Sequence, residues 1–354
     1  MTIDAFFKKA FNTLPEAEIF VPGRVNLIGE HIDYNGGRVL PLALQRGVTL
    51  ALSRRTDRVM RVSSDRFDGV AETVIGGDPP QTWARYAVYS VQLACDLGWI
   101  TTGADIGIVS SLNDGAGLSS SAALCVAVLK ALRSVLGRSE SDIELAQLAR
   151  RVENEYIGMP CGIMDQMAVA VARPGEALFL DTATLDYEPL SLPTRAVFVV
   201  LHSGVHRELS DGRYKQRKEE CDTAKRLLGT DDLCQVSLSD EAVGALPDVL
   251  RLRVRHCTTE HKRTVDAARS LRSGDLERFG QLMNANHRSM RDDFQVSLPA
   301  IDQLVATAQD AGALGARLTG GGFGGCIVAA VETKKRDRWI ADVLQENPQA
   351  FLVE

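Results

Sequence analysis

No stretch of the 354-residue sequence approaches the run of about 20 apolar residues that a membrane-spanning helix needs. The N-terminal segment, residues 1–10, also lacks the apolar core of a secretory signal. These two absences argue against a membrane partner and predict a cytoplasmic location.

Paired cysteines and an excess of positive charge are absent as well. The seven cysteines are scattered without CxxC spacing, which argues against a disulfide framework or a zinc site and favours reduced thiols. The net charge of -6 argues against nucleic acid as a partner. With 45% hydrophobic and 24% charged residues, the chain has a globular composition, and its length suggests two domains or one large α/β unit.

What the chain does contain is a glycine-serine stretch, residues 113–123, directly before an apolar segment, residues 124–136. Glycine allows tight turns and the close approach of a ligand, and the unpaired N–H groups at the start of a helix attract anions. The stretch therefore predicts either a phosphate site at the start of a buried helix or a plain helix cap rich in serine. It is not a P-loop, because no Gly-Lys-Ser/Thr follows the glycines.

Polar residues gather after the strand-like run that ends near residue 22. Arg24, Glu30, His31 and Asp33 stand within otherwise apolar sequence. Because buried charges need partners, this density predicts either an internal salt-bridge network or a site for a polar ligand.

Two further carboxylates, Glu153 and Asp165, need closer interpretation. Glu153 lies at the edge of the apolar stripe of a predicted helix that a Ser141–Glu144 capping box opens, where a solvated surface role is the ordinary reading. Asp165 follows a Pro/Gly turn in an apolar context. It is either a helix N-terminal acid favoured by the dipole or a buried functional acid.

Hydrophobic patterns give a coarse map of the elements. Residues 39–44, 48–52, 59–62, 72–74 and 104–109 read as strands, so the first portion is strand-rich and antiparallel in part. Residues 230–295 are mainly helical. A second glycine-rich stretch, residues 319–326, leads into a strand at 327–331, whereas a dinucleotide fingerprint would open a helix.

Three motifs, in this order, resemble those of the GHMP kinases, the small-molecule kinases named after galactokinase, homoserine kinase, mevalonate kinase and phosphomevalonate kinase. They are residues 22–31, 115–123 and 319–326. Within that superfamily, four stretches resemble the galactokinases: residues 23–33, residues 161–166, Tyr214 with Arg217 and Cys221, and residues 289–294.

The resemblance implies a two-lobed α+β fold with the active site in the cleft between the lobes. The N-terminal lobe, residues 1–178, would be ribosomal protein S5 domain 2-like and would carry the sugar-binding and phosphate-loop motifs. The C-terminal lobe, residues 179–354, would be an α/β-plait and would carry the glycine-rich third motif.

The resemblance also implies roles for individual residues. The triphosphate of ATP would be wrapped by Gly115, Ala116, Gly117, Leu118, Ser119, Ser120 and Ser121. Ser121 and Glu153 match the ligands of Mg²⁺, a hydroxyl and a carboxylate suited to a hard cation. The sugar site is matched by Arg24, Glu30, His31, Asp33, Gly162, Asp165 and Tyr214. Trp83 matches an aromatic residue near the adenine pocket, with plain core burial as the alternative.

The implied reaction is ATP-dependent phosphorylation of the C1 hydroxyl of D-galactose, which gives galactose 1-phosphate and ADP. Asp165 would accept the hydroxyl proton, with Arg24 beside it as electrostatic partner, and a monomer is expected. Ile32 and His202 depart from the galactokinase pattern. A kinase for another sugar, such as N-acetylgalactosamine, is therefore the first alternative, and a regulator that binds galactose and ATP without turnover is the second.

Overall fold

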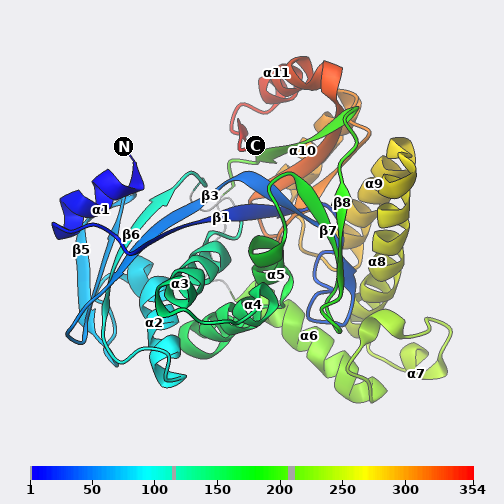
Figure 1. Cartoon of the computed structure of the whole chain (residues 1–354). Helices are drawn as coiled ribbons and strands as arrows, with labels where there is room; N and C mark the ends of the chain where they lie inside the picture. Colours follow the sequence, from blue (N-terminus) through cyan, green and yellow to red (C-terminus); the bar gives the residue numbers. More distant parts are fainter. Residues whose placement is uncertain (1, 114–116, 206–211) are drawn as a thin grey trace. The chain divides into compact units, whose positions relative to one another are not determined.

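The computed structural model of the chain describes residues 2–113, 117–205 and 212–354. These residues form two compact units. Unit 1 contains residues 2–24, 43–112 and 119–174, and unit 2 contains the described residues of 25–42, 113–118 and 175–354. Each unit combines helices with strands, as expected for the predicted α+β class (Figure 1). The lobe boundary predicted between residues 178 and 179 stays a prediction.

Unit 1 is built on a mixed sheet. Strand β3 (Pro41–Arg54) pairs with β1 (Ala17–Asn26) and, antiparallel, with β6 (Ala104–Ser110). Strand β4 (Val59–Ser64) runs parallel to β6 and antiparallel to β5 (Phe67–Val74). The prediction of a strand-rich, partly antiparallel first portion is confirmed, although the runs at 39–44 and 48–52 belong largely to the single strand β3.

Helices pack against this sheet and against one another. Helix α1 (Ile3–Phe11) contacts β6, and its Phe7 side chain is fully buried. Helix α3 (Ser120–Leu136) contacts α2 (Arg85–Asp96), α4 (Asp142–Arg151) and α5 (Met164–Val171), which lie around it in Figure 1. Nine α3 side chains are buried, and seven of them belong to the apolar run at 124–136, as that run predicts.

The turn after α4 is not α-helical. The predicted capping box at Ser141 and Glu144 is present and opens α4. The chain then continues as a π-helix (Val152–Ile157) that ends at Gly158 in the left-handed conformation, with φ 78°. π-Helical turns are rare in proteins, and those that occur are frequently found at functional sites. This one carries Glu153.

Unit 2 contains two sets of antiparallel strands. In one, β7 (Glu176–Asp181) pairs with β2 (Arg38–Val39) and β8 (Tyr187–Ser191). The other has the order β10 (Gly315–Thr319), β11 (Cys326–Glu332), β9 (Ala196–His202) and β12 (Phe351–Leu352). The glycine-rich third motif joins β10 to β11, and β11 contains the strand predicted at 327–331.

The helices of unit 2 are α6 (Arg213–Leu228), α7 (Glu241–Gly244), α8 (Asp248–Ser273), α9 (Leu276–Asp292), α10 (Pro299–Asp310) and α11 (Arg336–Glu346). Helices α8 to α11 contact its strands, whereas α6 and α7 pack against α8. Helices α8 and α9 lie side by side in Figure 1 and confirm the helical prediction for residues 230–295.

Two glycines allow α9 to approach β10 closely. A Cβ at Gly280 would lie 2.1 Å from the Leu314 carbonyl oxygen, and one at Gly315 would lie 2.3 Å from the Gly280 carbonyl oxygen. Because both obstacles are backbone atoms, only glycine fits at this crossing.

Within the described residues, no helix has both the length and the apolar character needed to cross a membrane.

Candidate active site

The glycine-serine motif leads into the buried helix α3, as the sequence predicts. Gly117 has φ 70° and Ser119 has φ 60°, both in the left-handed region. Ser119 is the N-cap residue, and its side chain makes no capping hydrogen bond. Ser120 is exposed and Ser121 is half-buried. Gly115 and Ala116, predicted to contact ATP, lie outside the described residues.

In unit 1, Asp165 and Arg24 form a two-point ion pair. Arg24 lies on β1, and Asp165 lies in the first turn of α5. Arg24 Nε donates to Asp165 Oδ1 at 2.9 Å, and Arg24 Nη2 donates to Asp165 Oδ2 at 2.7 Å. The arginine side chain is 6% exposed, whereas that of Asp165 is 31% exposed. The fork geometry fixes the carboxylate plane while leaving the carboxylate open to a small molecule.

Ser119 contacts the same carboxylate. Its hydroxyl donates to Asp165 Oδ2 at 2.7 Å. Arg24 and Ser119, which are far apart in the sequence, therefore both contact the carboxyl group of Asp165. Gly162, which is buried, lies just before α5, the helix that carries Asp165 in its first turn.

Glu153 is almost completely buried in the π-helix, at 6% exposure. Its Oε2 atom accepts a hydrogen bond from Gln166 Nε2 at 3.1 Å and lies 3.4 Å from Cys161 Sγ. Burial, and next the negative charge of Asp165, raise the pKa of Glu153 to about 7, while the hydroxyl of Ser121 acts in the opposite direction. The solvated surface reading of Glu153 is therefore wrong.

The surroundings of Glu153 fit a bound cation. Its Oε1 atom is buried and, among the described residues, has no hydrogen-bond partner. A cation would satisfy this oxygen and would offset the cost of ionising a buried carboxyl group. The donors on hand, a carboxylate and the Ser121 hydroxyl, are hard oxygen ligands of the kind that Mg²⁺ prefers. Within residues 2–113, 117–205 and 212–354, no group of three His, Cys, Asp or Glu side chains is arranged to hold a metal.

In unit 2, Glu30 supports the third motif. Its side chain is 3% exposed and forms an ion pair with Arg317, whose own side chain is 0% exposed, at 2.9 Å. The same Glu30 Oε1 atom accepts hydrogen bonds from Gly320 N at 2.6 Å and Thr319 Oγ1 at 3.2 Å. Glu30 thus fixes the start of the glycine-rich loop.

His31 lies in an aromatic cluster. Its φ of 60° places it in the left-handed region. Because a carbonyl oxygen only accepts, Nε2 donates to Gly321 O at 3.3 Å, and Nδ1 accepts from the Tyr34 hydroxyl at 2.8 Å. The His31 ring lies 4.6 Å from the Phe294 ring and 5.4 Å from that of Tyr214, centre to centre.

The remaining predicted sugar residues join the same part of unit 2. Tyr214, at the start of α6, is half-buried and lies against Gly321, where a Cβ would approach its ring to 3.0 Å. Asp33 is half-buried. Burial, followed by the charges of neighbours that include Asp33, raises the pKa of Tyr34 well above its usual value. Polar and aromatic groups therefore occur together here, as in many sugar sites.

Trp83 lies in the short 3₁₀ helix before α2 and is half-buried. Its ring stacks on that of Phe67, with centres 5.0 Å apart and planes 10° apart. The exposed stacked surface is compatible with the adenine assignment, which stays a prediction.

The two departures from the galactokinase pattern are both buried. Ile32 is 0% exposed and lies where a Cβ on Gly37 would touch it at 2.7 Å. His202 is 1% exposed, stacks on Phe351 and accepts a hydrogen bond from Gly204 N at 3.0 Å. Both side chains pack within unit 2.

Sequence reasoning missed several members of the site. It assigned no role to Arg317, and it did not place the Ser119 hydroxyl on Asp165. The argument that a buried charge needs a partner, used for Arg24 and Glu30, would also have singled out Arg317, which stands within an apolar strand. No local pattern could have paired Ser119 with a carboxylate 46 positions away.

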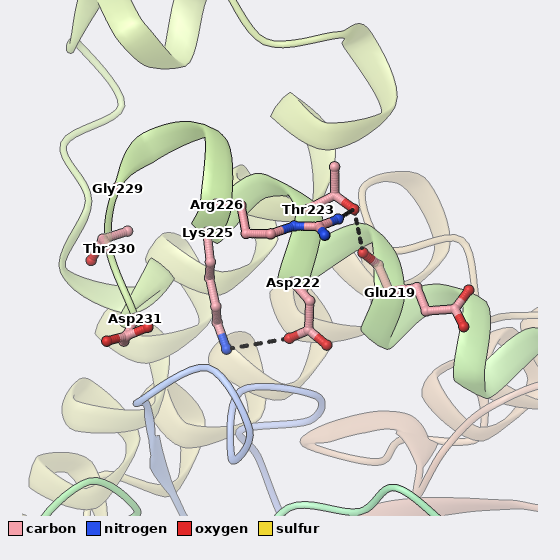
Figure 2. A pocket seen from close by; sticks show the side chains of 8 residues that line it. All are labelled: Glu219, Asp222, Thr223, Lys225, Arg226, Gly229, Thr230 and Asp231. Atoms are coloured by element: carbon pink, nitrogen blue, oxygen red, sulfur yellow. Dashed lines mark hydrogen bonds and ion pairs between the residues drawn. The ribbon is translucent and has the colours of Figure 1, made fainter.

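A pocket of about 820 Å³ lies along the C-terminal half of α6 and the turn after it. Figure 2 shows the side chains that line it, none of which belongs to the predicted site: Glu219, Asp222, Thr223, Lys225, Arg226, Gly229, Thr230 and Asp231. Lys225 lies 3.8 Å from Asp222 Oδ1, and Arg226 Nη2 donates to Thr223 Oγ1 at 3.0 Å. These basic groups are already paired with neighbours, so the pocket has no clear preference for an anion.

Three family models match consecutive parts of the chain. The galactokinase galactose-binding signature matches residues 5–54, the GHMP kinases N-terminal domain matches residues 85–173, and the GHMP kinases C-terminal domain matches residues 267–349. The N-terminal domain match includes Ser119, Glu153 and Asp165.

Individual relatives match almost the whole chain. A galactokinase of Roseiflexus sp. (strain RS-1) is 42% identical over 352 residues, which cover 96% of this chain and 89% of that protein. A galactokinase of Exiguobacterium sibiricum is 41% identical over 346 residues, 94% of this chain and 88% of that protein. The crystal structure of Lactococcus lactis galactokinase complexed with galactose has a TM-score of 0.93 at 31% identity and covers 99% of this chain and 97% of its own.

Proposed function

Because the chain belongs to the galactokinase family of GHMP kinases, we propose that it phosphorylates the C1 hydroxyl of D-galactose with Asp165 as proton acceptor. Membership makes it an ATP-dependent sugar kinase with the two-lobed α+β fold of the family. The observation that supports the role of Asp165 most directly is its carboxylate, held by Arg24 at two points and still 31% exposed.

The reaction requires a base beside the acceptor hydroxyl. The sugar oxygen forms a bond to the γ-phosphorus of ATP, the bond from that phosphorus to the bridging oxygen breaks, and ADP leaves. The proton of the C1 hydroxyl passes to Asp165. Arg24 keeps this carboxylate in place and balances its charge before the transfer. Positioning and electrostatics carry most of phosphoryl-transfer catalysis, so the base contributes on the order of 10²–10⁴-fold.

We assign the remaining predicted residues as follows. Gly115 to Ser121 would bind the phosphates of ATP, and Trp83 would lie near its adenine. Ser121 and Glu153 would hold Mg²⁺, which when bound neutralises phosphate charge. The buried Oε1 atom of Glu153 supports this assignment. Sugar hydroxyls would be bound by Arg24, Glu30, His31, Asp33, Gly162, Asp165 and Tyr214.

A cytoplasmic location also remains a proposal. It is supported by the seven cysteines, none of which forms a disulfide within the described residues, because thiols that stay reduced are typical of a reducing compartment. The monomeric state stays a prediction.

The direct test measures ADP release with magnesium-ATP and a panel of acceptors: galactose, glucose, N-acetylgalactosamine, talose, arabinose, mevalonate and homoserine. Preference for galactose is the expected result. Preference for another sugar would retain the kinase and change its substrate. A folded protein that binds ATP and phosphorylates nothing would be a regulator instead.

The role of Asp165 is tested by Asp165→Asn, which keeps the size of the side chain. Turnover should fall by roughly 10²–10⁴-fold, and the protein should stay folded with some loss of thermal stability, because Arg24 loses its charged partner. Asp186→Asn is the matched control, since Asp186 is exposed in a turn and its carboxylate accepts from Thr184 Oγ1. A folded Asp165→Asn protein with near-normal turnover would remove Asp165 from the mechanism.

A further inference from the structure

Ser119 has the position of a helix cap but does not act as one. A serine at an N-cap ordinarily has extended backbone and accepts a hydrogen bond from an N–H of the first turn. Ser119 has φ 60° and ψ 39° instead, and it makes no such bond to α3. Ser141, at the start of α4, does cap in the ordinary way: it has φ -69° and accepts from Glu144 N at 3.2 Å.

The left-handed backbone of Ser119 turns its hydroxyl toward the candidate base. This conformation is costly for a residue other than glycine, so it persists where the surroundings hold it in place. Here the Ser119 hydroxyl donates to Asp165 Oδ2 at 2.7 Å, and the residue is only 7% exposed. A strained residue that gives up a cap to reach a carboxylate is more readily explained by function than by helix stability.

The donors around Asp165 are unevenly divided between its two oxygens. Oδ2 accepts from both Arg24 Nη2 and Ser119, whereas Oδ1 accepts, among the described residues, from Arg24 Nε alone. Each carboxylate oxygen has about two lone-pair directions. Oδ2 is therefore fully used, and Oδ1 keeps one direction for a further proton.

We infer that Ser119 is a positioning residue that, together with Arg24, holds the rotation of the Asp165 carboxylate, occupies the second direction on Oδ2 and leaves Oδ1 as the atom that accepts the proton of the substrate. The inference rests on the proposed function of Asp165. It assigns the Ser119 hydroxyl to the base, so the phosphate contact proposed for this residue falls to its backbone N–H.

Ser119→Gly separates this role from a structural one. Glycine adopts φ 60° without strain, so the variant should unfold at the same temperature as the unchanged protein or higher. Loss of the hydroxyl should lower kcat by roughly 10- to 100-fold, because small losses of orientation at a reacting group are that costly. The KM values for ATP and sugar should stay the same, since ground-state binding is not altered.

Two further variants complete the test. Ser119→Ala also lacks the hydroxyl but keeps a side chain at φ 60°, so it should lose the same activity and be less stable than Ser119→Gly. Ser141→Gly is the matched control: it removes a serine that does cap a helix, and it should lower stability and leave kcat unchanged. Unchanged kcat in Ser119→Gly would overturn the inference. A raised KM for ATP with normal kcat would do the same, because it would assign the Ser119 hydroxyl to the phosphates of ATP and not to the base.

Combination with Asp165→Asn distinguishes this inference from the proposed function. If Ser119 acts through Asp165, adding Ser119→Gly to Asp165→Asn should cause no further loss of turnover. Should Asp165→Asn alone turn over normally, the proposed base is wrong; should it fail while Ser119→Gly works normally, only the positioning role is wrong. A crystal structure with galactose should show the C1 hydroxyl beside Oδ1, and contact with Oδ2 would refute the assignment of the atom.

Discussion

The buried carboxyl group of Glu153 makes a sharp prediction about stability and pH. Its pKa rises from 4.5 to about 7 on folding, first through burial and next through the charge of Asp165. The folded protein therefore holds this proton to higher pH than the unfolded chain does. The resulting contribution to stability is complete below about pH 4.5 and is lost as the pH rises through about 7. At about 1.4 kcal/mol for each pKa unit, ionising Glu153 costs about 3 kcal/mol at pH 8.

The substitution Glu153→Gln removes the ionisation and keeps the size of the side chain. Without magnesium, the two proteins should differ little at pH 4.5, and the variant should become the more stable one by about 3 kcal/mol at pH 8. Denaturant unfolding in EDTA, measured at steps between pH 4.5 and 8, gives the difference directly. Magnesium added at pH 8 should stabilise the unchanged protein and leave Glu153→Gln unaffected, because a cation favours the ionised carboxylate.

Glu155 supplies the control for this measurement. It lies in the same π-helix, but its side chain is 54% exposed and pairs with Arg151. Glu155→Gln should change stability by less than about 1 kcal/mol, without the rise with pH. A difference between the unchanged protein and Glu153→Gln that stays constant from pH 4.5 to 8 would refute the reasoning, since it would mean that burial does not oppose ionisation of Glu153.

Two predictions concern the support of the third motif. Gly280→Ala should destabilise the protein by about 1–3 kcal/mol or prevent folding, because its Cβ would meet Leu314 O at 2.1 Å. In the control Gly244→Ala, the new Cβ has nothing within 4 Å, so this variant should be neutral or mildly stabilising. Thermal unfolding of both variants checks this prediction. Arg317→Met should cost about 3–5 kcal/mol in denaturant unfolding because it leaves Glu30 buried without its ion pair, and a loss below about 1 kcal/mol would show that Gly320 and Thr319 suffice.

Much of the fold could be predicted because its elements have strong local signals. The alternation of residues 104–109 marks β6, and the serine and glutamate of the capping box mark the start of α4. The π-helix at 152–157 could not be predicted in this way. Its apolar positions continue the stripe of α4, so the pattern predicts an ordinary helix with Glu153 at the solvent edge. The wider turn and the packing around it decide that Glu153 is buried.

For the site, the sequence predicted which residues belong to it but not which partners they contact. The density of charge between Arg24 and Asp33 left open an internal network or a ligand site, and the structure contains two separate ion pairs, Arg24 with Asp165 and Glu30 with Arg317. Such pairings depend on long-range contacts between strands and helices, which no local pattern specifies. The resemblance to a family supplied candidate roles, but it did not supply the partners through which each residue would act.

The environments of Asp165 and Glu153 explain why only one of them is suited to proton transfer. Both carboxyl groups belong to unit 1, yet Asp165 is open to a ligand and has donors on both oxygens, while Glu153 is buried with one oxygen lacking a partner. A base must reach its substrate and keep a defined orientation, and the exposure of Asp165 and its contacts with Arg24 and Ser119 fit the role proposed for it. Glu153 instead needs a positive charge brought to it before it ionises at low cost. The same reaction can therefore use one carboxylate for the proton and the other for a cation, because the fold gives them opposite surroundings.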